Sequence, residues 1–301
     1  MLLGACAATE RTPAVVFSHS FPLSSDQAAV GLVGTYVASE NDTLLDVARR
    51  FDLGYTQLVS ANRGIDPWQP GAGRNITVPN LYLLPDGPRR GIVVNLVQNR
   101  LYYFPPDGGT VETYPIGVGV QGASTPIGTT RIVAKRAHPR WVPPASIRAE
   151  RPELPAVVPP GPDNPLGDYA LQLGWPSYLI HGTNKPDGVG RNASHGCLRL
   201  YPEDVERLFG EVAVGTPVRV VNEEVQTAWI GGDLYLAVYP TKEQADQLDV
   251  NEPVTPTMPP RLKQRVEAAA GSHPVHIDWS VVERAGRERT GIPVRVAAKE
   301  I

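Results

Sequence analysis

A cysteine and two histidines near residue 190 are the side chains best suited to catalysis in this chain. Ser194, His195, Gly196 and Cys197 are consecutive, and His181 lies upstream of them. A thiol attacks as a thiolate, and at an ordinary pKa near 8.5 only about a few per cent is ionised at neutral pH. Lowering that pKa by roughly 2 units requires about 2.7 kcal/mol, which an imidazolium or backbone N–H groups can supply. The pattern indicates a cysteine nucleophile served by histidine.

Gly196 adds to this interpretation. Glycine allows a positive φ or a close approach of the backbone to a reacting carbonyl, so the amides around Cys197 are candidate oxyanion donors. Two alternatives remain: an inert buried cysteine, and a zinc site built from His181, His195 and Cys197. The chain shows no evident fourth zinc ligand and no metal-type spacing. We therefore expect neither a metal nor a cofactor.

Two motifs resemble those of a known family. Residues Ile180–Asn184 read Ile-His-Gly-Thr-Asn, and Ser194–Arg199 reads Ser-His-Gly-Cys-Leu-Arg. They resemble the signature of the L,D-transpeptidases with a YkuD-type catalytic domain, and the gap between them resembles the periplasmic branch of that family. Family-like blocks follow the expected order at Gly91–Leu96, Tyr114–Gly119, Ser124–Gly128 and Asn164–Gly167. The resemblance covers about residues 88–222.

The resemblance implies an acyl transfer through a thioester on peptidoglycan tetrapeptide stems. In this interpretation Cys197 attacks the carbonyl that joins the diamino acid at position three to the terminal D-alanine. His181 accepts the thiol proton and then protonates the leaving amine, while the Gly182 carbonyl holds the other ring N–H. Ser194 and His195 shape the loop and contact the substrate.

The resemblance leaves the acyl acceptor open. A stem amine would give 3→3 cross-links, the lysine end of an outer-membrane lipoprotein or barrel protein would give anchoring to the wall, and water would give carboxypeptidase or hydrolase action. Arg199 is either a clamp for a stem carboxylate or part of a surface salt bridge. The resemblance also implies acylation of Cys197 by carbapenems. The alternative from another class is a glycan-binding wall protein with a decayed catalytic domain.

Bulk composition bears on partners and location. The chain has 301 residues and a formal net charge of −3, without a run of like charges, so nothing favours nucleic acid as a partner. No stretch reaches the ~18 apolar residues that span a bilayer. Residues Met1–Cys6 read Met-Leu-Leu-Gly-Ala-Cys and resemble a bacterial lipobox, but no basic segment or long apolar segment precedes Cys6. We expect a periplasmic protein, with lipid anchoring through Cys6 left open.

The segments around these motifs predict strands. Alternating residues in 91–96 and 101–104 flank a turn at 98–100, and strands are also expected at 111–120, 129–135, 178–181 and 216–221. A short helix is expected over 202–209, opened by proline and acids and stopped by Gly210. The prediction is a mainly β catalytic domain over 88–222, made of two packed sheets in a β-sandwich-like arrangement.

Smaller units flank this domain. Residues 1–34 are expected to be a tether. Helical spacing at 45–51 and 56–61 and a strand at 75–79 predict a βααβ unit over 35–80 that resembles a peptidoglycan-binding LysM module. The alternative for this unit is a small docking domain that does not bind sugar. Residues 223–301 predict an α+β appendage of unknown role, with a hairpin around 231–233, helices at 241–248, 261–270 and 278–287, and a strand at 292–296.

Overall fold

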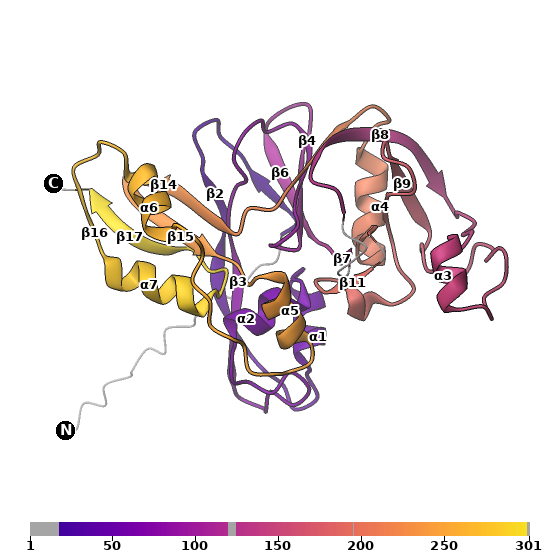
Figure 1. Cartoon of the computed structure of the whole chain (residues 1–301), viewed down its shortest axis with the longest axis horizontal. Coiled ribbons are helices and arrows are strands. Elements are labelled where there is room, and N and C mark those ends of the chain that lie inside the picture. The colour runs from indigo at the N-terminus through magenta and orange to yellow at the C-terminus, as the bar shows by residue number, and fades with distance from the viewer. Residues whose placement is uncertain (1–17, 120–124, 195, 300–301) are drawn as a thin grey trace, which may run out of the picture.

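The computed structural model of the chain describes residues 18–119, 125–194 and 196–299. Strands outweigh helices, as expected for a mainly β protein. Figure 1 shows the C-terminal segment at the left, a large curled sheet at the centre and right, and a unit with two short helices below. Cys6 and the first half of the expected tether lie outside the described residues.

The curled sheet has nine strands, in the order β1-β6-β5-β4-β13-β8-β9-β10-β12. Their bounds are β1 (Ser20–Pro22), β4 (Gly91–Asn95), β5 (Arg100–Phe104), β6 (Thr110–Pro115), β8 (Gly128–Ala137), β9 (Tyr169–Leu173), β10 (Leu179–His181), β12 (Leu198–Arg199) and β13 (Pro217–Val221). β8 joins the two halves. Its residues 128–131 pair with β13, and from Ile132 onwards it pairs with β9, with a register shift between Ile132 and Ala134. Such irregularities bend a strand, so one sheet supplies both layers of the expected sandwich.

The main core lies between these two halves and helix α4 (Pro202–Glu211). Ile92, Val94 and Leu101 from one half share it with Leu171 and Ile180 from the other. α4 begins at a proline, as predicted, but Gly210 does not stop it, because the last turn extends through Glu211. A glycine without a positive φ at that position does not act as a terminator.

A βααβ unit packs on the outer face of β4, β5 and β6. It consists of β2 (Ala29–Val37), α1 (Leu44–Arg50), α2 (Tyr55–Ala61) and β3 (Asn75–Leu83), and its two strands pair antiparallel along their whole length. Thr43 caps α1 in a capping box with Asp46. β4 and β5 are buried on both faces, because Val93 and Tyr102 pack against this unit while their neighbours face the main core.

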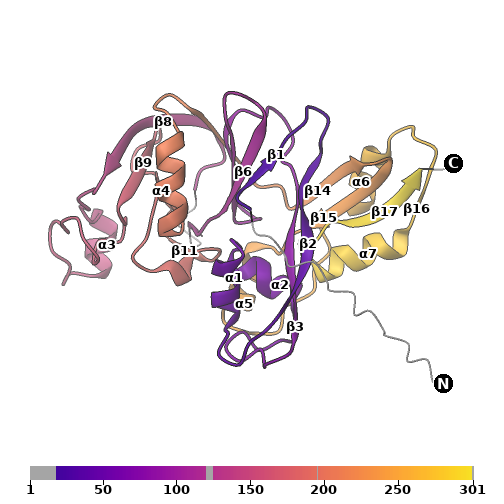
Figure 2. The ribbon, with the colours of Figure 1, turned by 180° about the vertical axis from the view of Figure 1, so that it is seen from behind.

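The expected tether over 1–34 is wrong for its described part. Residues 20–22 form β1, which pairs with β6 at the edge of the large sheet, and β2 begins at Ala29 (Figure 2). The βααβ unit therefore spans 29–83 rather than 35–80. The glycines in Ala29–Val37 obscure the alternation that would otherwise indicate a strand.

A backbone contact joins the βααβ unit to the segment that precedes the cysteine motif. Gly54, the N-cap of α2, has no capping side chain, and the Tyr55 and Thr56 N–H groups donate to the carbonyls of Val189 and Gly190 at 3.4 and 3.2 Å. A Cβ at Gly190 would lie 2.1 Å from the Gly54 Cα, so only glycine fits there. The first turn of α2 is thus capped by the loop that leads to Cys197.

The C-terminal segment forms a four-stranded sheet with three helices, in the strand order β14-β15-β17-β16. Its elements are β14 (Val225–Ile230), β15 (Asp233–Val238), α5 (Lys242–Asp249), α6 (Leu262–Ala270), β16 (Val275–Ile277), α7 (Trp279–Glu288) and β17 (Val294–Lys299). The hairpin and the three helices agree with the prediction, whereas β16 was missed. Thr241 caps α5 in a capping box with Gln244. Among the described residues, no helix is long and apolar enough to span a bilayer.

Three titratable side chains lie close together where the βααβ unit meets helix α4. His19 Nδ1 lies 3.2 Å from an Asp52 oxygen and 3.6 Å from an Asp204 oxygen. Asp52 precedes α2, Asp204 belongs to the first turn of α4, and both are buried. Burial raises the pKa of Asp52 to about 7 against the opposing effect of Arg100, and burial also raises the pKa of Asp204. The cluster connects the residue before β1, the loop between α1 and α2, and helix α4. Its contribution to the free energy of folding depends on pH.

Asp204→Asn should weaken the pH dependence of stability. The folded protein keeps protons on these carboxyls that the unfolded chain releases from about pH 4 upwards, so wild-type stability falls as pH rises towards 7. His19, whose pKa is lowered by burial, acts in the opposite sense in both proteins. We expect a smaller drop in Tm between pH 5 and pH 8 in the variant. Glu206→Gln, on the exposed side of α4, should behave as wild type; an equal drop in all three proteins contradicts the assignment.

Candidate active site

The parallel pairing of β10 with β12 brings the two sequence motifs together. Ile180 pairs with Leu198 and His181 with Arg199, and the Leu200 N–H donates to the His181 carbonyl at 2.9 Å. Ile180 and Leu198 are buried in the main core. Because side chains alternate along a strand, His181 and Arg199 occupy the opposite face, beside Cys197 at the start of β12. The Arg199 charge lowers the pKa of both Cys197 and His181.

His181 is held as a neutral base. Its ring is buried, and Nδ1 lies 2.6 Å from the Gly182 carbonyl oxygen, the contact expected from the sequence. A nitrogen facing a carbonyl must carry the proton, which leaves the lone pair on Nε2. Burial and then Arg199 lower the pKa of His181 to about 4, although the carbonyls of Gly182 and Leu166 act the other way. The imidazole is therefore uncharged at neutral pH.

Cys197 carries a partly exposed thiol. Its S–H donates to the Ser177 carbonyl at 3.6 Å. Burial raises the pKa of Cys197, opposed by a hydrogen bond with the Leu179 backbone and by the Arg199 charge. Desolvation therefore disfavours both the Cys197 thiolate and the His181 imidazolium.

The turn before Cys197 is held by residues that the sequence analysis did not assign. Gly196 has a φ of +100°, which explains the glycine, and its carbonyl accepts a hydrogen bond from the Thr125 hydroxyl at 2.8 Å. Gly117 exchanges two backbone hydrogen bonds with Arg199 at 2.8 and 2.9 Å. The sequence analysis included Thr125 and Gly117 only as parts of family-like blocks and assigned neither of them a role.

The remaining predicted residues are placed only in part. The backbone of Ser194 ends β11 (Asn192–Ser194), which pairs in parallel with β7 (Val118–Gly119). His195 lies outside the described residues. Arg199 is partly buried, burial lowers its pKa, and it forms no ion pair with any described residue. The surface salt bridge is therefore not what the structure shows for Arg199.

One of the three residues of the zinc interpretation, His195, lies outside the described residues. Within 18–119, 125–194 and 196–299, the one group of three side chains with metal-ligand spacing is His19, Asp52 and Asp204. That group lies at the junction between the βααβ unit and the start of α4.

Comparison with known proteins agrees with this geometry. The family model for the L,D-transpeptidase catalytic domain (YkuD) matches residues 89–220. The chain is 39% identical over 287 residues to "Probable L,D-transpeptidase YbiS" of Escherichia coli (strain K12), covering 92% of each protein. It is 37% identical over 274 residues to "Probable L,D-transpeptidase YcfS" of the same organism, covering 88% of this chain and 83% of the relative.

Solved structures align over smaller parts. A mutant L,D-transpeptidase of Enterococcus faecium is 24% identical with a TM-score of 0.36, and the alignment covers 44% of this chain and 50% of that one. The NMR structure of an Enterococcus faecium catalytic domain is 23% identical with a TM-score of 0.36, covering 45% of this chain and 99% of that one. The full-length relatives, in contrast, match nearly the whole chain at more than a third identity. The chain therefore belongs to the L,D-transpeptidase family.

Proposed function

We propose that this protein transfers the acyl group of a peptidoglycan tetrapeptide stem through a thioester on Cys197. The observation that carries the proposal is the pairing of β10 with β12, which brings the strand that carries His181 beside the segment that follows Cys197. Membership of the family supports peptidoglycan as the substrate class. The thioester and the identity of the acceptor are the finer steps proposed here.

In the first half-reaction the Cys197 sulfur attacks the carbonyl between the diamino acid and the terminal D-alanine. The thiol proton passes to Nε2 of His181, and a C–S bond forms as the tetrahedral intermediate appears. Backbone N–H groups of the Gly196 turn support the oxyanion. His181 then gives its proton to the leaving amine, and D-alanine departs.

In the second half-reaction an amine attacks the thioester carbonyl. The C–N bond forms, the C–S bond breaks, and the proton lost by the amine returns to the sulfur through His181. Gly182 keeps the ring oriented by accepting the Nδ1–H bond in both steps. Ser194 and His195 shape the loop, and Arg199 binds a stem carboxylate with its guanidinium.

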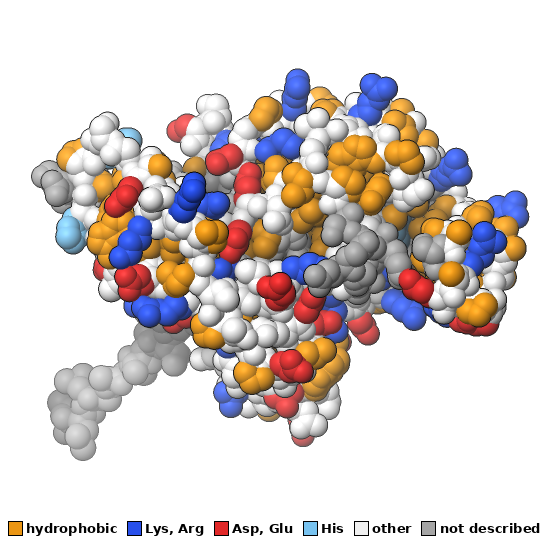
Figure 3. Space-filling model, viewed as in Figure 1, with side chains coloured by type: hydrophobic (Ala, Val, Ile, Leu, Met, Phe, Trp, Pro, Cys, Tyr) orange, Lys and Arg blue, Asp and Glu red, His pale blue; other side chains and the backbone are white. Residues whose placement is uncertain are grey.

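The cellular setting is also proposed. The βααβ unit would bind the glycan of the wall as a LysM module does, and the protein would act in the periplasm, with Cys6 as a candidate lipid anchor. The acceptor would be the lysine of an outer-membrane lipoprotein or barrel protein, or a stem amine; with water the product would be that of a carboxypeptidase. Figure 3 shows positive and negative side chains interspersed over one face of the molecule.

The pH dependence of alkylation tests the resting state of Cys197. Because its pKa is raised, the rate of reaction with iodoacetamide should rise about tenfold per pH unit from pH 6.5 to 8.5 without a plateau. Mass spectrometry in a Cys6→Ser background follows the Cys197 peptide alone, with Cys197→Ser as the blank. A plateau in the rate below pH 7 would show an ion-paired thiolate instead.

His181→Ala should lower the rate of thioester formation by roughly 10²–10⁴-fold, the usual contribution of a general base. His195→Ala should lower the rate of thioester formation by a smaller factor. Release of D-alanine from purified tetrapeptide muropeptides measures both. The reverse order would assign the base to His195.

A carbapenem should acylate wild-type Cys197, and intact-mass spectrometry should show one adduct that Cys197→Ala lacks. The adduct forms because a β-lactam carbonyl offers the same electrophile as the stem peptide. A folded wild-type protein whose thiol gives no adduct would favour the alternative of a wall-binding protein with a decayed catalytic domain.

A further inference from the structure

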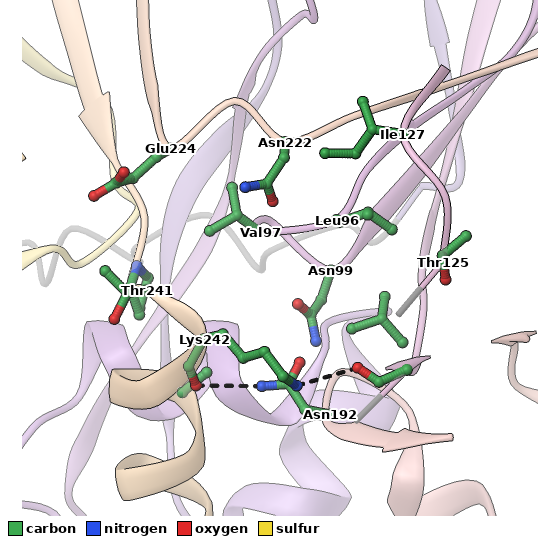
Figure 4. A pocket seen from close by; sticks show the side chains of 14 residues that line it. Leu96, Val97, Asn99, Thr125, Ile127, Asn192, Asn222, Glu224, Thr241 and Lys242 are labelled. Carbon is green, nitrogen blue, oxygen red and sulfur yellow. Dashed lines mark hydrogen bonds between the residues drawn. The ribbon is translucent and has the colours of Figure 1, made fainter. Parts of the chain in front are cut away.

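A cavity of about 270 Å³ lies between the C-terminal segment and the large sheet. The turn from β4 to β5, the β7–β11 pair and the start of α5 form its walls (Figure 4). The cavity adjoins the nucleophile segment, because Asn192 begins β11 and Thr125, another lining residue, donates its hydroxyl proton to the Gly196 carbonyl. The cavity and the nucleophile segment therefore share strand β11 and the contact of Thr125 with Gly196.

One wall carries a hydrogen-bond donor without a partner. Asn99 is only 6% exposed, and its side-chain nitrogen Nδ2 makes no hydrogen bond. Its φ of +53° explains why asparagine suits this turn, but it does not explain a buried amide left unpaired, which destabilises a fold. Figure 4 shows the amide pointing towards the side of the cavity formed by Lys242 and Asn192. Asn99 is one of the residues that line the cavity on this side.

The opposite wall carries a cation. Lys242, the first residue of α5, donates one N–H to the Gly119 carbonyl at 3.1 Å, and no carboxylate among the described residues pairs with it. An ammonium has three protons to donate, so two remain for a ligand. Glu224 also lines the cavity, but it is held by the Arg289 guanidinium at 2.5 Å. The balance of donors and charge favours an anion, and a carboxylate fits both Asn99 and Lys242.

The other lining residues are of both kinds. Leu96, Val97, Val118 and Ile127 are aliphatic, whereas Thr125, Asn192, Asn222 and Thr241 are polar. A ligand with a carboxylate for Lys242 and an aliphatic chain for the four aliphatic side chains fits this lining. That combination describes a terminal amino-acid unit of a peptide or protein.

We propose that this cavity binds the carboxylate and aliphatic chain of the amine-bearing acceptor in the second half-reaction. The inference rests on the proposed acyl transfer. Lys242 and its helix lie outside residues 89–220, which match the catalytic domain shared across the family. A subsite built by the C-terminal segment is therefore suited to the substrate that differs between family members, the acceptor, rather than to the common donor stem. The acceptor's amine attacks the thioester carbonyl as described above.

Two acceptor probes test the inference, Nα-acetyl-lysine and its carboxamide. Both present the same ε-amine, and only the first has a carboxylate. With a tetrapeptide muropeptide as donor, wild type should use the carboxylate form with about tenfold higher kcat/KM, since it gains a charge-assisted hydrogen bond. Lys242→Met should reduce this preference to near unity, and Lys242→Arg should restore most of it. Release of D-alanine in the absence of either probe should stay unchanged in both variants.

The matched control is Lys263→Met, an exposed lysine on α6 paired with Glu283. It should keep the wild-type preference. Asn99→Gly supplies a second readout, since it relieves the positive φ and removes the unpaired amide: the preference should fall while Tm rises by about 2 °C. A merely structural asparagine would give a lower Tm and an unchanged preference.

Each outcome decides one claim. Equal use of the two probes by wild type, or a preference that survives in Lys242→Met, overturns the acceptor subsite while leaving the transfer reaction in place. Absence of D-alanine release from wild type overturns the proposed function itself. Calorimetric titration of Nα-acetyl-lysine into wild type and Lys242→Met then still tests the cavity, because tighter binding to wild type requires no turnover.

Discussion

The parallel hydrogen bonding of β10 with β12 is the constraint on which the site depends. It sets His181 opposite Arg199 and starts β12 immediately after Cys197, although the two motifs belong to separate strands. The other face of the same two strands buries Ile180 and Leu198 in the main core. A slip of one residue would turn the catalytic face inward and the apolar face outward, so core packing enforces the register that chemistry needs. Stability and geometry are specified by the same contacts.

The electrostatics of this site differ from those of a preformed ion pair. Burial raises the pKa of Cys197 and lowers that of His181, so both groups are neutral before substrate arrives. A neutral pair costs less to bury than a thiolate and an imidazolium. The Arg199 charge favours the thiolate and disfavours the imidazolium.

The sequence alone predicted what local patterns encode. The positive φ at Gly196 and the C-terminal hairpin each follow from a few adjacent residues, and the Gly182 contact was implied by the family resemblance. What it missed depends on distant partners. β1 is short and becomes a strand only by pairing with β6, and the contact of Thr125 with Gly196 joins separate loops. The raised pKa of Cys197 reflects burial by the whole fold, which no local motif reports.

The contact between Gly54 and Gly190 has a consequence for how the chain can be divided. The βααβ unit shares a core with β4, β5 and β6, and the first N–H groups of α2 are satisfied by the loop that precedes the nucleophile. An excised fragment bounded by the family match would expose Val93 and Tyr102 to water and leave the Val189 and Gly190 carbonyls without their donors. Exchange of the βααβ unit for another domain would therefore also require changes in the loop at Val189 and Gly190.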